Sequence, residues 1–454
     1  MNSLILTPAP LFARKMCNMT CFSRALRYNA LMEWENLLST YRIGRNKAEA
    51  SGSRSEFNKD YGRVLYSSAF RRLQDKTQVF PIGRNDYVRT RMTHSLEVAN
   101  VGRALAKKLH EIISLRSPGL LPEPEALEDI LATVCLAHDI GNPPFGHSGE
   151  DAINTALREL GALSAVGLPG YVFEGNAQGF RLLSKICDPI KGQGLDLTAA
   201  TLAAFTKYPC SSESTLYKKF GIMPEELDIF RSVASHCGLA QLTTHLDEWA
   251  RHPLALLMEA ADDISYLIAD IEDAFFSHII SYEECITQLA SMAPGFDISR
   301  HLGAAGAHEQ ASRVHLARAL AVGSCIERVA DVLDAHYDDI MSGVFVGSLV
   351  KSADNWDTFA HVKDFSVARI YNHESVLRIE IAGFNVIKKL LELYMYWVTE
   401  PLSSLGRKVG DILHAPAACC DPSGRFLHVI DYVSGMTDSY ALQTYNKLFG
   451  RESL

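Results

Sequence analysis

The sequence predicts an all-α fold, with a helical bundle core followed by an extended C-terminal helical portion. Apolar residues recur at helical spacing through most of the chain, whereas alternating strand patterns are few and short. The composition is that of an ordinary globular protein, with 47% hydrophobic and 21% charged residues among 454. We expect a helical core over residues 32–290 and a further helical portion with subunit contacts over residues 291–454.

The first 31 residues contain four basic residues and no acidic residue. Such a start is compatible with a targeting peptide, but the apolar run Leu4-Ile5-Leu6 is short and is followed by Pro8 and Pro10. We therefore expect a disordered N-terminal extension over residues 1–31, with a targeting peptide as the alternative.

Six segments carry a helical period, and breaks with Pro or Gly separate several of them. The clearest is the segment from Met92 to Leu115, whose apolar residues include Leu96, Leu105 and Leu109. Residues 188–223 are irregular and polar, and residues 291–306 form a loop-rich joint. The helices are expected at 92–115, 148–160, 175–186, 254–276, 311–333 and 376–397.

The sequence from His138 to Glu150 holds the most informative group of polar residues. His138 follows a helical segment and shares its buried face with Cys135, which we expect to be a packed thiol. Adjacent His138 and Asp139 offer an imidazole nitrogen and a carboxylate oxygen, a pair suited to a divalent transition metal.

A helix end and a new helix follow at once. Gly141 and two prolines stop the first helix. His147 and Glu150 then stand three residues apart at the start of the next helix, where Ser148 is a candidate N-cap.

A metal site needs further ligands, and the sequence offers His94 together with Asp262 or Asp263. Burying a carboxylate in so apolar a helix is costly unless it is paired or bound to metal. Asp262, Tyr266 and Asp270 recur at i, i+4 and i+8 and therefore point the same way. The alternative for this series is a solvated stripe on a surface helix.

Several longer motifs resemble the bacterial deoxyguanosine triphosphate triphosphohydrolases, a family of HD-domain phosphohydrolases. The resemblance runs in family order over residues 32–445. It rests on Ser68 to Pro81, Arg89 to Val98, His138 to Glu150, Glu174 to Gly179, Glu259 to Tyr266 and Asp431 to Asp438.

The resemblance implies a role for each of several residues. His94, His138, Asp139 and Asp262 would be the metal ligands, with Asp263 only a neighbour. His147 and Glu150 would be the acid/base pair. The substrate contacts would comprise Gln78 and Asp270 for the sugar 3′-hydroxyl, Tyr266 under the sugar, Arg91 at the phosphates, and Asn142, Asn176, Lys207 and Tyr208 elsewhere in the pocket.

The implied reaction is attack at the α-phosphorus of a deoxynucleoside triphosphate (dNTP), releasing a deoxynucleoside and inorganic tripolyphosphate. The cofactor would be a divalent ion, Mg or Mn first, with Fe, Co, Ni or Zn also accommodated. The family further implies homo-oligomers, hexamers among them, and single-stranded DNA or an allosteric nucleotide as further partners. The alternative functions are an HD nucleoside monophosphate phosphatase and a weakly catalytic nucleotide sensor or single-strand-binding protein.

Bulk properties limit the partners. The net charge of −9 gives no whole-chain electrostatic reason to bind nucleic acid or anionic membrane. No apolar run approaches membrane-spanning length. The ten cysteines form no C-x-x-C pair, and the vicinal pair Cys419-Cys420 argues against a disulfide framework, so we expect a cytoplasmic protein with reduced thiols.

Charges on the C-terminal helices, Arg378, Glu380, Arg407 and Arg425, are expected on exposed surface, with a neighbouring subunit's pocket as the alternative. The sequence leaves open the base preference, the physiological metal, the oligomer size, allosteric activation by nucleotides and the role of residues 1–31.

Overall fold

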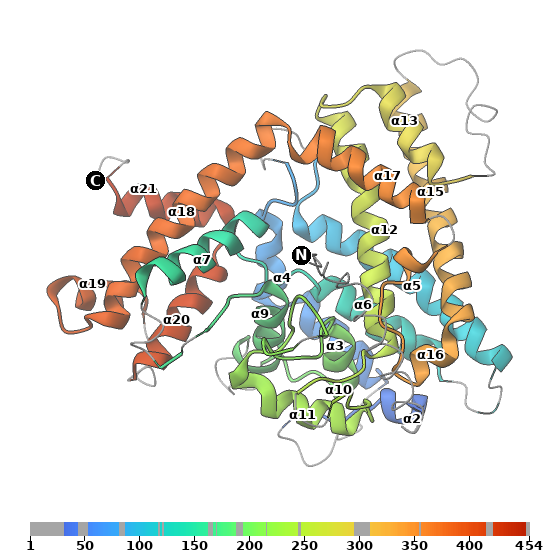
Figure 1. Ribbon diagram of the computed structural model, residues 1–454, viewed down its shortest axis with the longest axis horizontal. Coiled ribbons are helices and arrows are strands. Elements are labelled where there is room, and N and C mark those ends of the chain that lie inside the picture. The colour runs from blue at the N-terminus through green and yellow to red at the C-terminus, as the bar shows by residue number, and fades with distance from the viewer. Residues whose placement is uncertain are drawn as a thin grey trace, which may run out of the picture.

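The computed structural model is all-α, as predicted (Figure 1). It describes residues 31–43, 53–80, 87–116, 119, 122–161, 167–168, 170–187, 194–214, 216–243, 247–294, 309–353, 356–414 and 421–450. In these ranges the only β-type pairings are isolated bridges, such as Thr77 with Thr90. The extension predicted over residues 1–31 and the break at 117–118 lie outside the described residues, apart from Leu31. Within the described ranges, none of the helices combines the length and apolar character needed to span a bilayer.

Short helices open the described chain, and the long helices of the N-terminal part follow. The elements up to residue 291 are α2 (Trp34–Leu37), α3 (Glu56–Leu65), α4 (Ser68–Arg72), η1 (Leu73–Asp75), α5 (Arg91–Arg116), α6 (Pro124–Ala137), α7 (Gly146–Leu160), α9 (Gly175–Arg181), η2 (Leu182–Ile186), α10 (Ala199–Phe205), η3 (Pro224–Glu226), α11 (Leu227–His236), α12 (Pro253–Phe276) and α13 (Tyr282–Ser291).

The C-terminal part is also helical throughout its described length. Its elements are α15 (Gln310–Ala335), α16 (Tyr337–Met341), η5 (Val350–Ser352), α17 (Trp356–Ser366), η6 (Val367–Tyr371), α18 (Glu374–Thr399), α19 (Ser404–Ile412), α20 (Pro422–Ser434) and α21 (Asp438–Leu448). The six long helices predicted from the period are all present, within a few residues of the expected bounds.

One helix lies in a segment that was expected to be irregular. Residues 188–223 were expected to be irregular, but α10 occupies Ala199–Phe205 and all seven of its residues are buried. A helix that is apolar on every side shows no amphipathic period, so the pattern that revealed the other helices is absent. Thr198 begins it, because its side chain accepts a hydrogen bond from the Thr201 backbone N–H.

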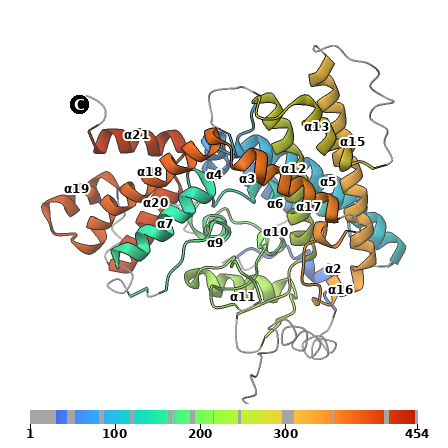
Figure 2. The same ribbon diagram turned by 45° about the horizontal axis from the view of Figure 1, so that its top comes forward.

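Buried apolar side chains form two large clusters. The first core is built mainly by α3, α5, α6, α10, α11, α12, α13 and α15, with Leu105, Leu131 and Leu257 among its fully buried members. The second core joins α7 to α18, α19, α20 and α21, and contains Ile153 and Leu390. Both ribbon views show α7 lying among these C-terminal helices (Figures 1 and 2).

The two cores do not follow the sequence division at residue 290. Helix α7 comes from the N-terminal part but packs in the second core, whereas α15 belongs to the C-terminal part and packs in the first. The segment from 138 to 150 therefore passes from one core to the other, and the site described next lies at this junction.

Candidate functional site

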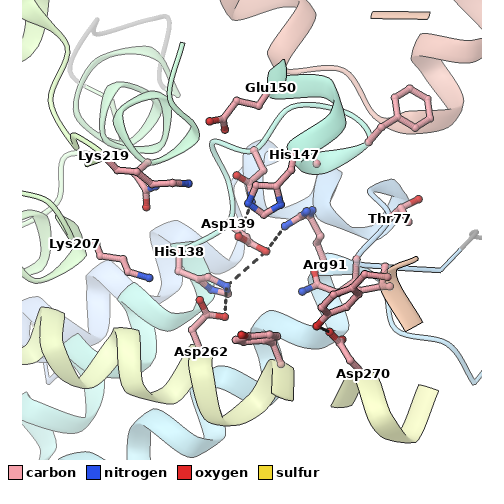
Figure 3. A pocket seen from close by; sticks show the side chains of 18 of the residues that line it. Thr77, Arg91, His138, Asp139, His147, Glu150, Lys207, Lys219, Asp262 and Asp270 are labelled. Atoms are coloured by element: carbon pink, nitrogen blue, oxygen red, sulfur yellow. Dashed lines mark hydrogen bonds and ion pairs between the residues drawn. The ribbon is translucent and has the colours of Figure 1, made fainter. Parts of the chain in front are cut away.

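A pocket of about 610 Å³ lies where the two cores meet. All the site residues predicted from the sequence line it except His94, which is buried directly beside it. Figure 3 shows the arrangement, with His138, Asp139 and Asp262 in the middle, Lys207 and Lys219 on one side, and Asp270 and Thr77 on the other.

Three side chains from three helices form a candidate metal centre. His94 lies in the first turn of α5, His138 caps the C-terminus of α6, and Asp262 lies in the middle of α12. Their nearest ligand atoms all lie within 4.8 Å of one another. The Oδ1 atom of Asp262 is 3.1 Å from His94 Nε2 and 3.5 Å from His138 Nε2.

The orientation of His138 fits a metal ligand. Its Nδ1 donates to the backbone carbonyl of Cys135 at 2.7 Å, a partner supplied by the preceding helical turn. This bond holds Nδ1 protonated and directs Nε2 at the carboxylates. Among the described residues that buried Nε2 atom has no hydrogen-bond partner, so a cation held there in place of a proton would satisfy it.

The electrostatics of the centre also favour a cation. Burial lowers the pKa of His138, but the carboxylates of Asp139 and Asp262 outweigh it and raise the pKa to about 9. The pKa of Asp262 shifts in the other direction. The two imidazoles outweigh burial and lower this pKa well below the ordinary value. The group thus stabilises positive charge at the point where the three side chains converge.

Asp139 stands beside the other three candidate ligands. Its Oδ2 atom is 3.6 Å from His138 Nε2 and forms an ion pair of 2.6 Å with Arg91. Its Oδ1 atom accepts a hydrogen bond from the side-chain amide of Asn142 at 2.6 Å. Burial alone would raise the pKa of Asp139, but the positive charge of Arg91 helps to lower it to about 2. This carboxylate is therefore charged at neutral pH.

The structure separates Asp262 from Asp263. Only Asp262 joins the two histidines. Asp263 accepts a hydrogen bond from Ser348 at 3.4 Å, and burial raises its pKa to about 7. One residue along a helix is about 100° around its axis, so the two side chains leave α12 in different directions.

His147 and Glu150 line the pocket from the first turns of α7, but the helix begins differently from the prediction. Ser148 is not the N-cap. The N-cap is Phe145, in the left-handed conformation at φ +60° and without a side-chain capping bond. The Ser148 hydroxyl instead donates to the carbonyl of Glu380 at 2.6 Å, because the second core places α18 against this turn.

Both side chains have shifted pKa values. Burial, with the positive charges of Arg91 and Lys219, lowers the pKa of His147. Burial, with the negative charge of Glu174, raises the pKa of Glu150 to about 7. No hydrogen bond joins His147 to Glu150 among the described residues; Glu150 accepts one from the Gly175 backbone N–H at 3.3 Å.

The predicted stripe on α12 is not a solvated surface. Asp262, Tyr266 and Asp270 all line the pocket, and Asp270 is only 3% exposed. Asp270 accepts a hydrogen bond of 2.5 Å from the hydroxyl of Tyr371 in η6, and burial raises its pKa to about 7. Gln78 lines the same pocket, and its buried Oε1 atom has no hydrogen-bond partner among the described residues.

Cations gather at the other end of the pocket. Lys207 follows α10, and its amino group lies 3.5 Å from Glu259. Burial opposes its charge, but the neighbouring carboxylates raise its pKa. Tyr208 also lines the pocket there, whereas the Asn176 side chain donates to Glu174 at 2.6 Å.

Sequence reasoning missed several lining residues. Lys219 lies in a polar segment without a period, and Tyr371 lies at a helix irregularity 101 residues after Asp270. Glu380 is exposed, as expected, but it also lines the pocket of its own chain. None adjoins a motif along the chain, so no local signal could have found them.

Comparisons with known proteins agree with this picture. The HD domain family model matches residues 91–175 and the phosphohydrolase-associated domain model matches residues 349–447. A deoxyguanosinetriphosphate triphosphohydrolase-like protein of Synechocystis is 39% identical over 92% of this chain and 99% of its own length. One from Pseudomonas aeruginosa is 36% identical over 93% and 100%. A deoxyguanosinetriphosphate triphosphohydrolase of Yersinia pseudotuberculosis is 30% identical over 87% and 94%.

Proposed function

The chain belongs to the HD-domain family of deoxyguanosinetriphosphate triphosphohydrolase-like proteins, and we propose that it hydrolyses dNTPs, dGTP among them, to a deoxynucleoside and inorganic tripolyphosphate. One observation carries the proposal. A single pocket brings together a candidate metal centre, a buried imidazole, a polar stripe and a cationic end, which are the groups that hydrolysis at an α-phosphorus requires.

The metal would be held by His94, His138, Asp139 and Asp262. The buried, unpartnered Nε2 atom of His138 and the convergence of the donors support this set. When bound, a divalent ion supplies Lewis acidity toward the phosphate and favours deprotonation of a water. Two nitrogen and two oxygen donors suit Mg or Mn and also accommodate Fe, Co, Ni or Zn.

His147 would move the proton of the reaction. Its lowered pKa keeps the imidazole neutral at pH 7, so that one ring nitrogen can accept a proton from the attacking water. The resulting imidazolium can pass a proton to the departing 5′-oxygen of the nucleoside. Glu150, whose pKa is about 7, would exchange protons with this position as a second acid/base group.

The triphosphate would lie at the cationic end of the pocket. It carries close to four negative charges, and Arg91, Lys207 and Lys219 line the space beside the metal centre. Tyr208, Asn142 and Asn176 would add hydrogen-bond donors from the same walls. Lys219 joins this set from the structure alone.

The sugar would lie on the stripe of α12. Gln78 and Asp270 can accept or donate to a 3′-hydroxyl, and Gln78 has a buried oxygen still unpaired. Tyr266 would pack under the ring, where a 2′-hydroxyl would collide. Beyond it, Val79, Val367 and Ile379 offer an apolar wall for the base.

We also propose that the protein forms homo-oligomers, with a hexamer as the expected size. Large apolar side chains remain exposed on the C-terminal helices, including Ile381 at 63% and Tyr396 at 44%. Single-stranded DNA or an allosteric nucleotide would be further partners, as in the resemblance described above.

Product analysis tests the proposal. Purified protein is incubated with each dNTP and with several divalent metals in turn, and products are separated by chromatography. Deoxynucleoside and tripolyphosphate in equal amounts are expected. Release of orthophosphate from monophosphates would indicate a phosphomonoesterase instead, and binding of nucleotide or single-stranded DNA without turnover would indicate a sensor. Asp262→Ala is the metal-site control.

A further inference from the structure

One carboxylate from the C-terminal end of the chain holds two loops of the pocket. Asp438, the first residue of α21, is 7% exposed. Its Oδ2 atom accepts a hydrogen bond from the backbone N–H of Thr77, and its Oδ1 atom accepts one from the backbone N–H of Phe145, both at 2.9 Å. The two partners lie 361 and 293 residues earlier in the sequence, so only the fold brings them to one side chain.

Each of the two N–H groups adjoins a residue of the proposed reaction. Thr77 directly precedes Gln78, which we assigned to the sugar 3′-hydroxyl, and Phe145 stands two residues before His147. A carboxylate hydrogen bond to a backbone N–H is charge-assisted and directional. The position of Asp438 therefore fixes the distance between the two loops from outside the pocket.

The backbone at Phe145 needs such support. Phe145 has φ +60° and Gly146 has φ +58°, and a left-handed conformation is unfavourable for a residue with a side chain. The ring of Phe145 packs where Gly383 of α18 has no side chain, since an added Cβ would lie 2.6 Å from the Phe145 Cβ. The C-terminal helices thus hold both the N–H and the ring of this residue.

A buried lysine joins the same segments a second time. Lys76, 2% exposed, donates from its amino group to the backbone carbonyls of Asn142 and of Ser434, the latter at 3.1 Å. Asn142 lies in the turn that leads to His147, and Ser434 is the last residue of α20. The link between the C-terminal helices and the pocket loops is therefore doubled.

We propose that Asp438 is a positioning residue, which sets His147 and Gln78 relative to each other without touching the substrate. The inference rests on the proposed function. The metal centre should not depend on it, because α5, α6 and α12 carry His94, His138 and Asp262 within the first core. Two carboxylate oxygens are needed for two N–H groups, and an asparagine supplies only one acceptor oxygen.

The test compares Asp438→Ala and Asp438→Asn in the metal-loaded, full-length protein. Ser439→Ala is the matched control, since the Ser439 hydroxyl makes an exposed hydrogen bond of 2.8 Å to Asp75 at the same turn. Amide hydrogen exchange is followed for peptides covering residues 74–80 and 142–149, with residues 124–137 as the internal reference. Metal content and kcat/KM for dGTP and dideoxy-GTP are measured in parallel.

We expect faster exchange in both loop peptides of Asp438→Ala, unchanged exchange in the reference peptide, and parental metal content. Misplacement of reacting groups by about 1 Å costs about 10²-fold in rate, so kcat/KM for dGTP should fall by about that factor. The preference for dGTP over dideoxy-GTP should narrow, because Gln78 moves as well. Asp438→Asn should be intermediate, and Ser439→Ala should match the parent.

Two results would overturn the inference. One is unchanged exchange in both loops of the alanine and asparagine variants. The other is a loss of activity that merely follows the unfolded fraction, with parental KM and parental dideoxy discrimination in the folded remainder. If the parent protein releases no nucleoside from any dNTP, the proposed function fails instead, and hydrogen exchange alone then decides whether Asp438 holds the two loops.

Discussion

At the scale of single residues, the candidate site contains buried polar side chains that have few hydrogen-bond partners among the described residues. His138 keeps one ring nitrogen on a backbone carbonyl and leaves the other buried without a partner. Asp270 is buried with a raised pKa and has one hydroxyl as its hydrogen-bond donor among the described residues. Such groups lower the stability of a fold, which indicates that they serve binding or catalysis.

The assignment of Asp262 as the metal ligand on α12 can be tested by metal content. Asp262→Ala should abolish metal binding, because Asp262 converges with the two histidines, whereas Asp263→Ala should reduce it far less, since Asp263 is directed at Ser348. Elemental analysis of the purified variants measures this. Equal loss of metal in both variants would contradict the assignment.

His147 should be needed for turnover but not for metal binding. His147→Ala should retain metal but lower kcat by about 10²- to 10⁴-fold, the usual contribution of one general acid/base group. Metal content and steady-state kinetics on the same preparation test this. Near-normal turnover with full metal content would show that His147 has only a structural role.

The raised pKa of Asp270 predicts a pH-dependent stability. A carboxyl whose folded-state pKa is raised from 3.8 to about 7 contributes stability that is fully present below its unfolded pKa and is lost as the pH rises through about 7. The side chain of Asp270→Asn does not ionise, so this variant does not lose that stability as the pH rises. The difference in free energy of unfolding between Asp270→Asn and the parent should therefore shift in favour of the variant by on the order of 2 kcal/mol between pH 5 and pH 8.

Denaturant unfolding at both pH values, with metal kept saturating, measures this difference. Asp331 is exposed on α15, so that Asp331→Asn is the control and should show the same difference from the parent at both pH values. An Asp270→Asn advantage that does not change with pH would contradict the raised pKa.

At the scale of elements, helix α7 decides how the site is built. It carries His147 and Glu150 but packs in the second core with α18, α20 and α21, while α5, α6 and α12 carry the proposed metal ligands in the first core. The distance between the candidate metal centre and the proposed acid/base group is therefore set by contacts of the turn from 142 to 146, not by a single rigid helix. Phe145 against Gly383 is one of these contacts, and a Cβ added at Gly383 would overlap the Phe145 side chain.

Gly383→Ala should affect one loop of the pocket and not the other, which distinguishes their contributions. The added Cβ would overlap the Cγ atom of Phe145, so we expect it to move Phe145 together with His147 and to leave Thr77 and Gln78 in place. We expect kcat to fall by about 10- to 10²-fold, with parental metal content and parental dGTP over dideoxy-GTP preference. Gly323→Ala on α15, where nothing lies within 4 Å of the added Cβ, is the control. A smaller preference for dGTP over dideoxy-GTP in Gly383→Ala than in the parent would show that the substitution affects both loops.

At the scale of the whole molecule, the pocket is ordered from end to end. Lys207 and Lys219 lie on one side, His138, Asp139, Asp262 and His147 lie in the middle, and Asp270 lies on the other side (Figure 3). In the proposed function these positions would receive the triphosphate, its α-phosphorus and the sugar in that order. Residues of both cores line it, so a nucleotide bound there contacts the two halves of the molecule at once.

Sugar discrimination should follow from that order. A site built to hydrogen-bond a hydroxyl strongly rejects an analogue without it, so dideoxynucleotides should be poor substrates of the parent. Asp270→Ala should raise KM for the normal substrate and narrow that gap. Tyr266→Ala should relax the exclusion of ribonucleotides more than Asp270→Ala does, because the clash with a 2′-hydroxyl is at Tyr266.

The measurement is kcat/KM for one dNTP, its ribo form and its dideoxy form, on the parent and both variants. Equal turnover of the deoxy and dideoxy substrates by the parent would mean that Asp270 and Gln78 do not recognise the sugar.

The sequence by itself determined the all-α class, the six long helices and the residues that gather in the pocket, because helical period and short polar motifs are local signals. The helical pattern left Asp262 and Asp263 open as ligands, and only the resemblance to the family favoured Asp262. It did not determine the start of α7, since Ser148 has the chemistry of an N-cap but bonds to α18 instead. It gave no sign of α10, whose burial on every side removes the period.

Only the tertiary structure decided which distant residues complete the site. Lys219, Tyr371 and Glu380 reach the pocket through packing of segments with no motif, and Asp438 reaches both Thr77 and Phe145 across about 300 residues or more of chain. The physical reason is that these contacts depend on how two hydrophobic cores pack against each other. Local propensity fixes each helix, but the burial of apolar surface between helices far apart in sequence fixes where their side chains meet.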